Sequence, residues 1–358
     1  MTPSMAAHAS SSSSRRERVP TQHFQPVGNL LGQTLDGRYR LDDVIGSGGM
    51  GTVYRATHVT IGKTLAVKVL AQEFAGDDIF RRRFLREAQA ISQISHHNVV
   101  EVSDFGVTPT GSLYLVMEYL QGESLSDMLD REGGLGWRRA KPIILQVCRA
   151  LQSAHDKGIL HRDVKPENCM RISRTDNPDF VKVLDFGLAK MLMAEPGIDI
   201  SLTAKSGGIM GTPEYMSPER IRGQDLDARS DVYALGVLAY ELVTGCVPYS
   251  GDHYTKVLDQ HLNAAPVPPR KVAPALDISR GVENVILRAL DKAPEQRFAS
   301  AGELADAFEQ VETVVSRSPG DSGAASRERT YRVIIFILVA LVFVLSGLLL
   351  ANLTSAAG

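Results

Sequence analysis

The spacing of apolar residues divides the chain into a part with strand patterns, followed by a part with helical patterns. Short apolar runs typical of β-strands lie at 39–44, 65–70 and 113–120. Between the second and third runs, apolar residues recur every three to four positions over 79–94, which predicts an amphipathic helix. After residue 125 the pattern is mostly helical, so we expect an α+β fold in which the strands come first.

Two helices stand out in the second part of the chain. The apolar residues of 141–157 form one stripe, which predicts a helix that packs against the core. The segment 232–243 is apolar over most of its length and predicts a helix that opens after Asp231. The helical pattern ends near residue 315, so we expect one ordered domain over 35–315.

The segments on either side of this domain differ from it in composition. Residues 1–34 hold a serine run, several arginines and few apolar residues, which predicts a disordered arm. No apolar segment follows the arginines directly, so the arm does not have the pattern of a signal peptide. Residues 316–332 are rich in Ser, Gly and Pro at their start and predict a linker.

A long uncharged segment, 333–351, follows the linker. As a helix it would reach ~28 Å, enough to cross the hydrocarbon core of a bilayer. A buried soluble helix is the alternative, but a helix after a flexible linker has no core to join. We therefore expect a single transmembrane helix in the cell membrane, followed by a short extracytoplasmic tail at 352–358. Three arginines before it favour a cytoplasmic location for the ordered domain.

Charge and cysteine content narrow the function. The formal net charge is −2, without the basic surplus of a nucleic-acid-binding protein, so we expect no nucleic-acid partner. The three cysteines are widely separated and lack the spacing of a metal site. They are typical of buried apolar residues in a reducing compartment. A redox role for Cys169 is the less favoured alternative.

The chemistry of the chain is concentrated at 161–168. Asp163 can accept the proton of an attacking hydroxyl, and Lys165 can neutralise charge that grows on a moving phosphoryl group. Asn168 and Asp185 can hold a metal ion from two sides. This set suits phosphoryl transfer from a Mg-nucleotide. At these residues, and at the Asp-Phe-Gly triplet that begins at Asp185, the chain resembles a protein kinase.

A glycine-rich stretch at 45–54 follows the first predicted strand. A lone Gly-x-Gly-x-x-Gly is a weak signal, since dinucleotide-binding folds share it. The dinucleotide version requires a helix to follow, whereas Thr52-Val53-Tyr54 continues a strand pattern. We therefore expect a β-hairpin whose glycines let backbone N–H groups approach phosphates, with Ile45 and Val53 against an adenine ring.

Lys68 lies inside the apolar strand 65–70, where a charge is costly unless it is paired. We expect Glu87, on the helix 79–94, to be its partner; a surface position for Glu87 is the alternative. In the kinase resemblance, Lys68 binds the α- and β-phosphates and the Lys68–Glu87 pair sets the active state. The resemblance therefore adds both residues to the catalytic set.

The resemblance also places a hinge between two lobes at 117–120, where the Glu118 carbonyl and the Leu120 amide would bond adenine. The nucleotide contacts that it implies are Ile45, Gly46, Ser47, Gly48, Gly49, Met50, Gly51, Thr52, Val53, Ala66, Lys68, Met117, Glu118, Leu120 and Met170. It implies ATP as the cofactor, with Mg²⁺, or Mn²⁺ in its place, at Asn168 and Asp185.

An activation loop should run over 185–219, and a phosphate within it would pair with Arg162. The candidate sites are Ser201, Thr203 and Ser206. Our hypothesis is autophosphorylation at Thr203 or Ser206.

The family pattern assigns supporting roles to residues around this loop. Thr212 would pack against Asp163 and Lys165 and shape the acceptor groove. Glu219 would pair with Arg297, and Asp231 would brace the catalytic loop.

Taken in order over 39–315, the motifs most resemble the bacterial eukaryote-like (Hanks-type) serine/threonine protein kinases. The resemblance implies a two-lobed fold with a β-rich N-lobe and a helical C-lobe. It also implies transfer of the ATP γ-phosphate to Ser or Thr hydroxyls of proteins. A homodimer of kinase domains is implied by the resemblance only.

Two alternatives remain for the function. One is a membrane-tethered pseudokinase that acts as a binding module. Pseudokinases usually lack a key lysine or acid, whereas Lys68, Asp163, Asn168 and Asp185 are all present. The other is a small-molecule kinase, which Lys165 and the segment 211–219 argue against.

Overall fold

The computed structural model describes residues 30–48, 51–71, 78–186 and 212–311. The predicted transmembrane segment 333–351, the linker and tail around it, residues 1–29 and the candidate sites Ser201, Thr203 and Ser206 lie outside these ranges. Among the described residues, no helix is both long and apolar enough to span a bilayer.

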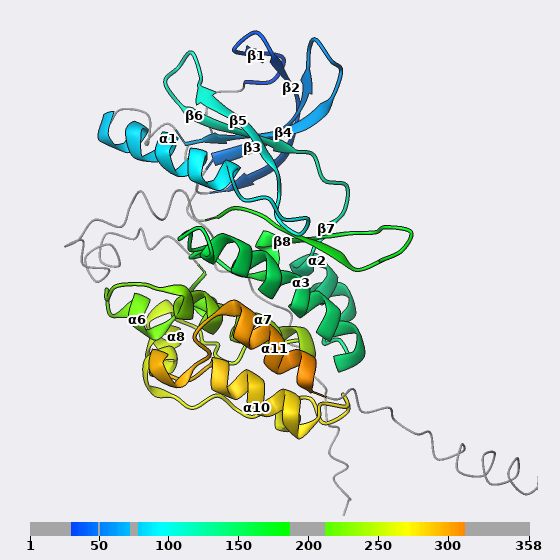
Figure 1. Cartoon of the computed structure of the whole chain (residues 1–358), viewed down its shortest axis with the longest axis vertical. Coiled ribbons are helices and arrows are strands. Elements are labelled where there is room, and N and C mark those ends of the chain that lie inside the picture. The colour runs from blue at the N-terminus through cyan, green and yellow to red at the C-terminus, as the bar shows by residue number, and fades with distance from the viewer. Residues whose placement is uncertain (1–29, 49–50, 72–77, 187–211, 312–358) are drawn as a thin grey trace, which may run out of the picture. The chain divides into compact units, whose positions relative to one another are not determined.

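The first lobe is built on a six-stranded sheet in the order β1-β2-β3-β4-β6-β5 (Figure 1), in which every pair of neighbours is antiparallel. Its strands are β1 (Thr34–Leu35), β2 (Tyr39–Gly48), β3 (Gly51–His58), β4 (Thr64–Leu70), β5 (Val102–Val107) and β6 (Leu113–Glu118). The three predicted strand runs correspond to β2, β4 and β6. The first strand, β1, begins at Thr34, and Leu30 before it is buried.

Alternation along β4 explains why an apolar strand can carry a lysine. Leu65, Val67 and Val69 join the apolar cluster on one face of the sheet. Ala66 belongs to the other face, whose cluster also includes Phe84 of the helix α1 (Asp78–Ser92). Side chains of a strand point alternately to opposite faces, so Lys68 shares the face of Ala66.

The second lobe is mostly helical, with a small sheet in the order β7-β8-β9. The strands of this sheet are β7 (Glu123–Ser124), β8 (Cys169–Ile172) and β9 (Phe180–Val183). The helices are α2 (Leu125–Glu132), α3 (Trp137–His155), α6 (Pro218–Ile221), α7 (Ala228–Thr244), α8 (Tyr254–Asn263), α9 (Pro269–Val272), α10 (Arg280–Ala289) and α11 (Ala301–Gln310). Short 3₁₀ turns are η2 (Pro166–Asn168), η3 (Pro213–Tyr215) and η4 (Pro294–Gln296).

The helix α7 forms the centre of this lobe, because all its residues from Asp231 to Val243 are buried. The predicted apolar helix is therefore confirmed. The helix α3 begins at Trp137, one turn before the expected residue 141, with Pro142 inside it. Pro142 is the sixth residue of the helix and lies beyond the N–H groups that have no intrahelical partner, so the helix continues through it at the cost of one i→i−4 hydrogen bond.

Candidate active site

The expected glycine hairpin is formed by β2 and β3, which pair Gly48 with Gly51 and Ser47 with Thr52. Gly49 and Met50 lie outside the described residues. Gly51 has φ 141°, and a Cβ on it would lie 2.1 Å from the carbonyl oxygen of Val69. A glycine is therefore required here by the close approach of β4, in addition to any role in admitting phosphates.

Lys68 pairs with Asp185 and not with the expected Glu87. Its Nζ lies 2.8 Å from Asp185 Oδ2, and only 15% of its side chain is exposed. Glu87 instead accepts hydrogen bonds at 3.0 Å and 3.3 Å from its neighbour Arg86. The expected Lys68–Glu87 pair is therefore wrong for this structure. Asp185 lies closer to Lys68, and Arg86 lies closer to Glu87.

The catalytic loop brings three of the predicted residues together. Asn168 Nδ2 donates to the Asp163 carbonyl oxygen at 2.7 Å and to Asp163 Oδ2 at 3.1 Å. Lys165 Nζ lies 3.5 Å from the same Oδ2 and donates to Thr212 Oγ1 at 3.2 Å. The carboxylate, the cation and the expected acceptor-groove residue Thr212 therefore form one connected group.

Asp231 holds the start of this loop. Its two carboxylate oxygens accept the backbone N–H groups of His161 at 2.7 Å and Arg162 at 2.9 Å. His155 Nε2 lies 2.8 Å from Asp231 Oδ2. Burial alone would raise the pKa of Asp231, but the contacts with His155 and His161 bring it below its ordinary value. The brace predicted from the sequence is confirmed.

His161 ties the loop to the segment that follows β9 and includes Asp185. Its Nε2 lies 2.8 Å from the Leu184 carbonyl oxygen, while its Nδ1 lies 3.2 Å from the Asp163 backbone N. Burial lowers the pKa of His161, which favours the neutral ring. A proton on Nε2 satisfies both contacts, so His161 braces the loop and leaves Asp163 as the base candidate.

The hinge residues expected to bind adenine lie at the end of β6. Met117 pairs with Ala66, and Glu118 pairs with Leu65, across β6 and β4. Met117 is 7% exposed and belongs to the larger apolar cluster. Ala66 and Met117 are thus direct neighbours across the two strands, so both could contact the same adenine ring.

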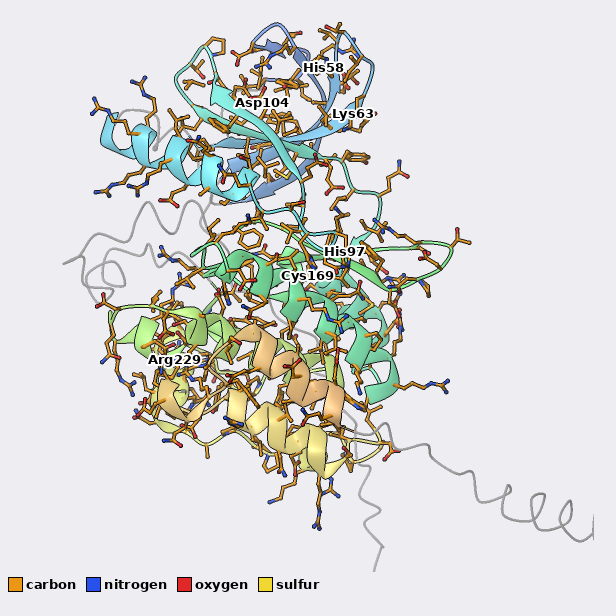
Figure 2. The ribbon with its side chains drawn as sticks, viewed as in Figure 1. His58, Lys63, His97, Asp104, Cys169 and Arg229 are labelled. Carbon is orange, nitrogen blue, oxygen red and sulfur yellow. The ribbon has the colours of Figure 1, made fainter. Side chains whose placement is uncertain are left out.

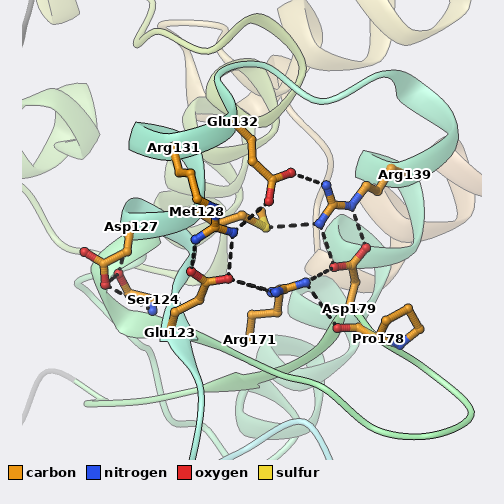
Figure 3. Close-up of polar contacts among 10 residues, drawn as sticks. All are labelled: Glu123, Ser124, Asp127, Met128, Arg131, Glu132, Arg139, Arg171, Pro178 and Asp179. Atoms are coloured by element: carbon orange, nitrogen blue, oxygen red, sulfur yellow. Dashed lines mark hydrogen bonds and ion pairs between the residues drawn. The ribbon is translucent and has the colours of Figure 1, made fainter.

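A ring of charges holds β7 against β8 just beyond the hinge (Figure 3). Its members alternate in charge and are Glu123, Arg131, Glu132, Arg139, Asp179 and Arg171. The two strands pair Ser124 with Met170, the expected adenine contact of the second lobe. Gly122 allows this approach, since a Cβ on it would lie 2.0 Å from the Arg171 carbonyl oxygen. The ring therefore fixes Met170 relative to the hinge.

The predicted pair of Glu219 and Arg297 is buried. Two hydrogen bonds of 2.8 Å join the guanidinium to the carboxylate, and the Arg297 side chain has no exposed surface. Ser230 Oγ donates to the same carboxylate at 2.6 Å. Burial by itself raises the pKa of Glu219, but these bonds from Arg297 and Ser230 lower it to about 2.

A small pocket lies beside Asp163 and is lined by Thr212, Met216 and Ser217, among others. Arg220 also lines it and donates to the Arg162 carbonyl oxygen. Arg220 was not predicted as a site residue, because its only signal in the sequence is its position directly after Glu219.

Asn168 and Asp185 are suited to a divalent metal. The Leu184 N–H donates to the Asn168 carbonyl oxygen at 2.8 Å, which brings the two residues to adjoining positions. Asn168 Nδ2 is committed to Asp163, so its Oδ1 would be the ligand atom for a metal ion. The described residues hold no group of three or more His, Cys, Asp or Glu side chains suited to a metal. Two oxygen donors suit Mg²⁺, which is usually completed by waters and phosphate oxygens.

Cys169 is the first residue of β8 (Figure 2). It is fully buried, and burial raises the pKa of its thiol, so the structure favours the packing role over the redox alternative.

Comparisons with known proteins agree with this geometry. The family model described as the protein kinase domain matches residues 39–308. The serine/threonine-protein kinase pkn3 of Myxococcus xanthus is 44% identical over 271 residues, which cover 76% of this chain and 49% of pkn3. PknB of Mycobacterium tuberculosis is 42% identical over 273 residues, which cover 75% of this chain and 42% of PknB. The chain thus spans half or less of the length of these relatives.

Solved structures show the same likeness. The crystal structure of the Mycobacterium tuberculosis PknI kinase domain superposes with a TM-score of 0.60 at 31% identity and covers 78% of this chain and 97% of that one. The structure of Rad53 in complex with AMP-PNP gives a TM-score of 0.63 at 28% identity and covers 76% of this chain and 66% of that one. The chain has the two-lobed kinase fold and belongs to the protein kinase domain family, among whose members it is similar to bacterial serine/threonine-protein kinases.

Proposed function

We propose that the protein is an ATP-dependent serine/threonine protein kinase. The observation that carries this proposal is the contact between the two halves of the site. Lys68 of β4 meets Asp185 at 2.8 Å, while Asp163, Lys165 and Asn168 are joined within one loop. The similar bacterial proteins are named as serine/threonine-protein kinases, which supports the same activity here.

Each residue has a role that follows from its position. Asp163 orients the acceptor hydroxyl and takes its proton, and Lys165 neutralises charge on the group in transfer. Lys68 binds the phosphates of ATP, and the hairpin of β2 and β3 covers them with backbone N–H groups. Asn168 and Asp185 would hold Mg²⁺, which supplies charge neutralisation at the phosphate oxygens when bound. Catalysis is therefore mostly positioning and electrostatic stabilisation.

The acceptor is a Ser or Thr side chain of a protein. Support comes from the bond between Lys165 and Thr212, which holds the segment that includes Thr212 and Ser217 beside Asp163. A small-molecule kinase needs no such segment. The pseudokinase alternative is disfavoured because Lys68, Asp163, Asn168 and Asp185 are all present, and because Asp163 and Asn168 are hydrogen-bonded to each other.

Two further parts of the proposal concern residues outside the described ranges, and a third concerns assembly. The segment 333–351 anchors the protein in the cell membrane with the kinase domain in the cytoplasm, supported by its length and lack of charge. Thr203 or Ser206 is autophosphorylated, supported by the presence of Arg162 in the catalytic loop, since an arginine there could pair with the added phosphate. Kinase domains pair as homodimers, supported by family resemblance alone.

The test uses the full chain with γ-labelled ATP, Mg²⁺ and a general protein acceptor. Asp163→Asn is expected to abolish phosphate transfer and leave nucleotide affinity nearly unchanged, because Asp163 acts on the hydroxyl. Asp252→Asn is the matched control, since 91% of the Asp252 side chain is exposed. Equal transfer by wild type and Asp163→Asn would refute the assignment of the base. Nucleotide binding without any transfer by the wild type would favour the pseudokinase.

A further inference from the structure

Lys182 is a second lysine inside an apolar strand, and no catalytic role accounts for it. It lies on β9, where every residue is buried, and it is itself only 8% exposed. Its neighbours Val181 and Val183 are 0% and 1% exposed. A charge at such a position is costly unless it is paired and hydrogen-bonded. The groups that pair with the Lys182 ammonium therefore indicate its role.

The Lys182 ammonium joins three segments of the chain. Its Nζ donates to the Val99 carbonyl oxygen at 3.1 Å and to Glu118 Oε1. Glu118 Oε1 also accepts the Glu101 backbone N–H at 2.8 Å, and the Glu118 N–H donates to the Glu101 carbonyl oxygen at 3.0 Å. One carboxylate oxygen of the hinge is thus held by β9 and by the segment 98–101 at once.

The segment 98–101 is itself bonded along β9. The Val183 N–H donates to the Asn98 carbonyl oxygen at 2.7 Å, and the Val100 N–H donates to the Val183 carbonyl oxygen at 3.0 Å. Asn98 Nδ2 donates to the Val181 carbonyl oxygen at 2.6 Å. Lys182 lies between Val181 and Val183, the residues through which β9 is bonded to the segment 98–101. Its ammonium therefore connects these two bonded segments to Glu118 of the hinge.

We propose that Lys182 is a positioning residue for the nucleotide site, acting through the Glu118 carboxylate; this inference rests on the proposed kinase function. Glu118 ends β6, and its carbonyl is the expected adenine contact. Three residues after Lys182 comes Asp185, which pairs with Lys68. The ammonium therefore sets the distance between the part of the site that takes the adenine and the part that takes the phosphates.

A residue that only stabilises the fold would give a different result from a positioning residue. Loss of a structural pair lowers the melting temperature and leaves the kinetics of the folded fraction unchanged. Loss of positioning raises KM and Kd for ATP in the folded protein, with a smaller change in kcat, because Lys182 touches none of the reacting groups.

The experiment compares Lys182→Met, Glu118→Gln and the double variant with wild type in the full chain. It measures Kd for ATP with Mg²⁺, KM for ATP, kcat and the melting temperature. Lys182→Met should raise KM and Kd for ATP by about tenfold, as expected for a charged hydrogen bond. The double variant should be no weaker than Lys182→Met alone, because it leaves no unpaired buried charge. Lys157→Met, at an exposed lysine, is the control.

An unchanged KM and Kd in folded Lys182→Met, beside an active wild type, would overturn the inference. So would a double variant whose loss of affinity equals the product of the two single losses, since Lys182 would then not act through Glu118. If Lys182→Met does not fold, the double variant, in which both charges are removed, is compared with Glu118→Gln instead. The same two quantities, KM and Kd for ATP, are measured for both. A wild type that transfers no phosphate would instead count against the proposed function, which keeps the two failures distinct.

Discussion

Lys68 Nζ lies 2.8 Å from Asp185 Oδ2, which joins a lysine of the six-stranded sheet to the residue that follows β9 by two positions. This ion pair connects the two lobes at the point where the phosphates of a nucleotide are expected. Lys68, which is proposed to bind the phosphates, and Asp185, which is proposed to bind the metal ion, are therefore already in contact before a nucleotide binds.

Lys68→Met is therefore expected to lower the rate of phosphate transfer by at least about 100-fold, a typical loss when one charge-stabilising group is removed. The initial rate with labelled ATP measures it. Lys63→Met (Figure 2) is the matched control, since Lys63 is an exposed lysine of the same lobe. Comparable rates for the two variants would contradict the role given to Lys68.

Arg297→Met should destabilise the protein by ~3–5 kcal/mol, because it leaves the Glu219 carboxylate buried without its cation. Urea unfolding measures the loss. Arg229→Met provides the comparison, since it removes the more exposed pair with Asp227 and should cost ~0–1 kcal/mol. Equal losses in the two variants would show that the buried pair does not anchor α6.

The pKa of Glu219, lowered to about 2 from 4.5, gives this stabilisation a defined pH dependence. A carboxyl whose pKa is lower in the folded state stabilises the protein above its unfolded pKa, and the effect is lost as the pH falls towards the folded pKa. The melting-temperature difference between wild type and Glu219→Gln should thus be constant from pH 7 to about 5 and should shrink between pH 4.5 and pH 2. A difference that grows on acidification would contradict the assignment.

Gly51→Ala should impair both folding and nucleotide binding, because the new Cβ would lie 2.1 Å from the Val69 carbonyl oxygen and must displace β4. Gly62→Ala is the control: Gly62 has φ 67°, but its Cβ would meet nothing within 4 Å. It should cost only the ~1–2 kcal/mol of the left-handed conformation. Thermal unfolding and ATP titration of both variants measure the difference. A Gly51→Ala protein as stable as Gly62→Ala would argue against the close approach.

Motif order and periodicity were sufficient to predict the fold class and the glycine hairpin, while the pair of Glu219 with Arg297 was implied by the resemblance to the kinase family. The sequence could not identify the partner of Lys68. Glu87 and Asp185 could each pair with it, and tertiary packing decides which carboxylate lies nearest. Arg86 adjoins Glu87 in the sequence, so a local contact wins for Glu87. Lys182 could have been found, since a lysine within the run Phe-Val-Lys-Val-Leu carries the same signal that drew attention to Lys68.

The left-handed backbone at Arg162 and Asp185, with φ 63° and 49°, has an energetic consequence. For residues with a side chain, such conformations cost of order 1–3 kcal/mol each and persist only where the surroundings enforce them. Here the enforcement comes from Asp231, which accepts the Arg162 N–H, and from Lys68, which pairs with Asp185. Part of the protein's folding free energy is therefore stored as strain beside the reacting groups, so that thermostability and catalytic geometry oppose each other at these two residues.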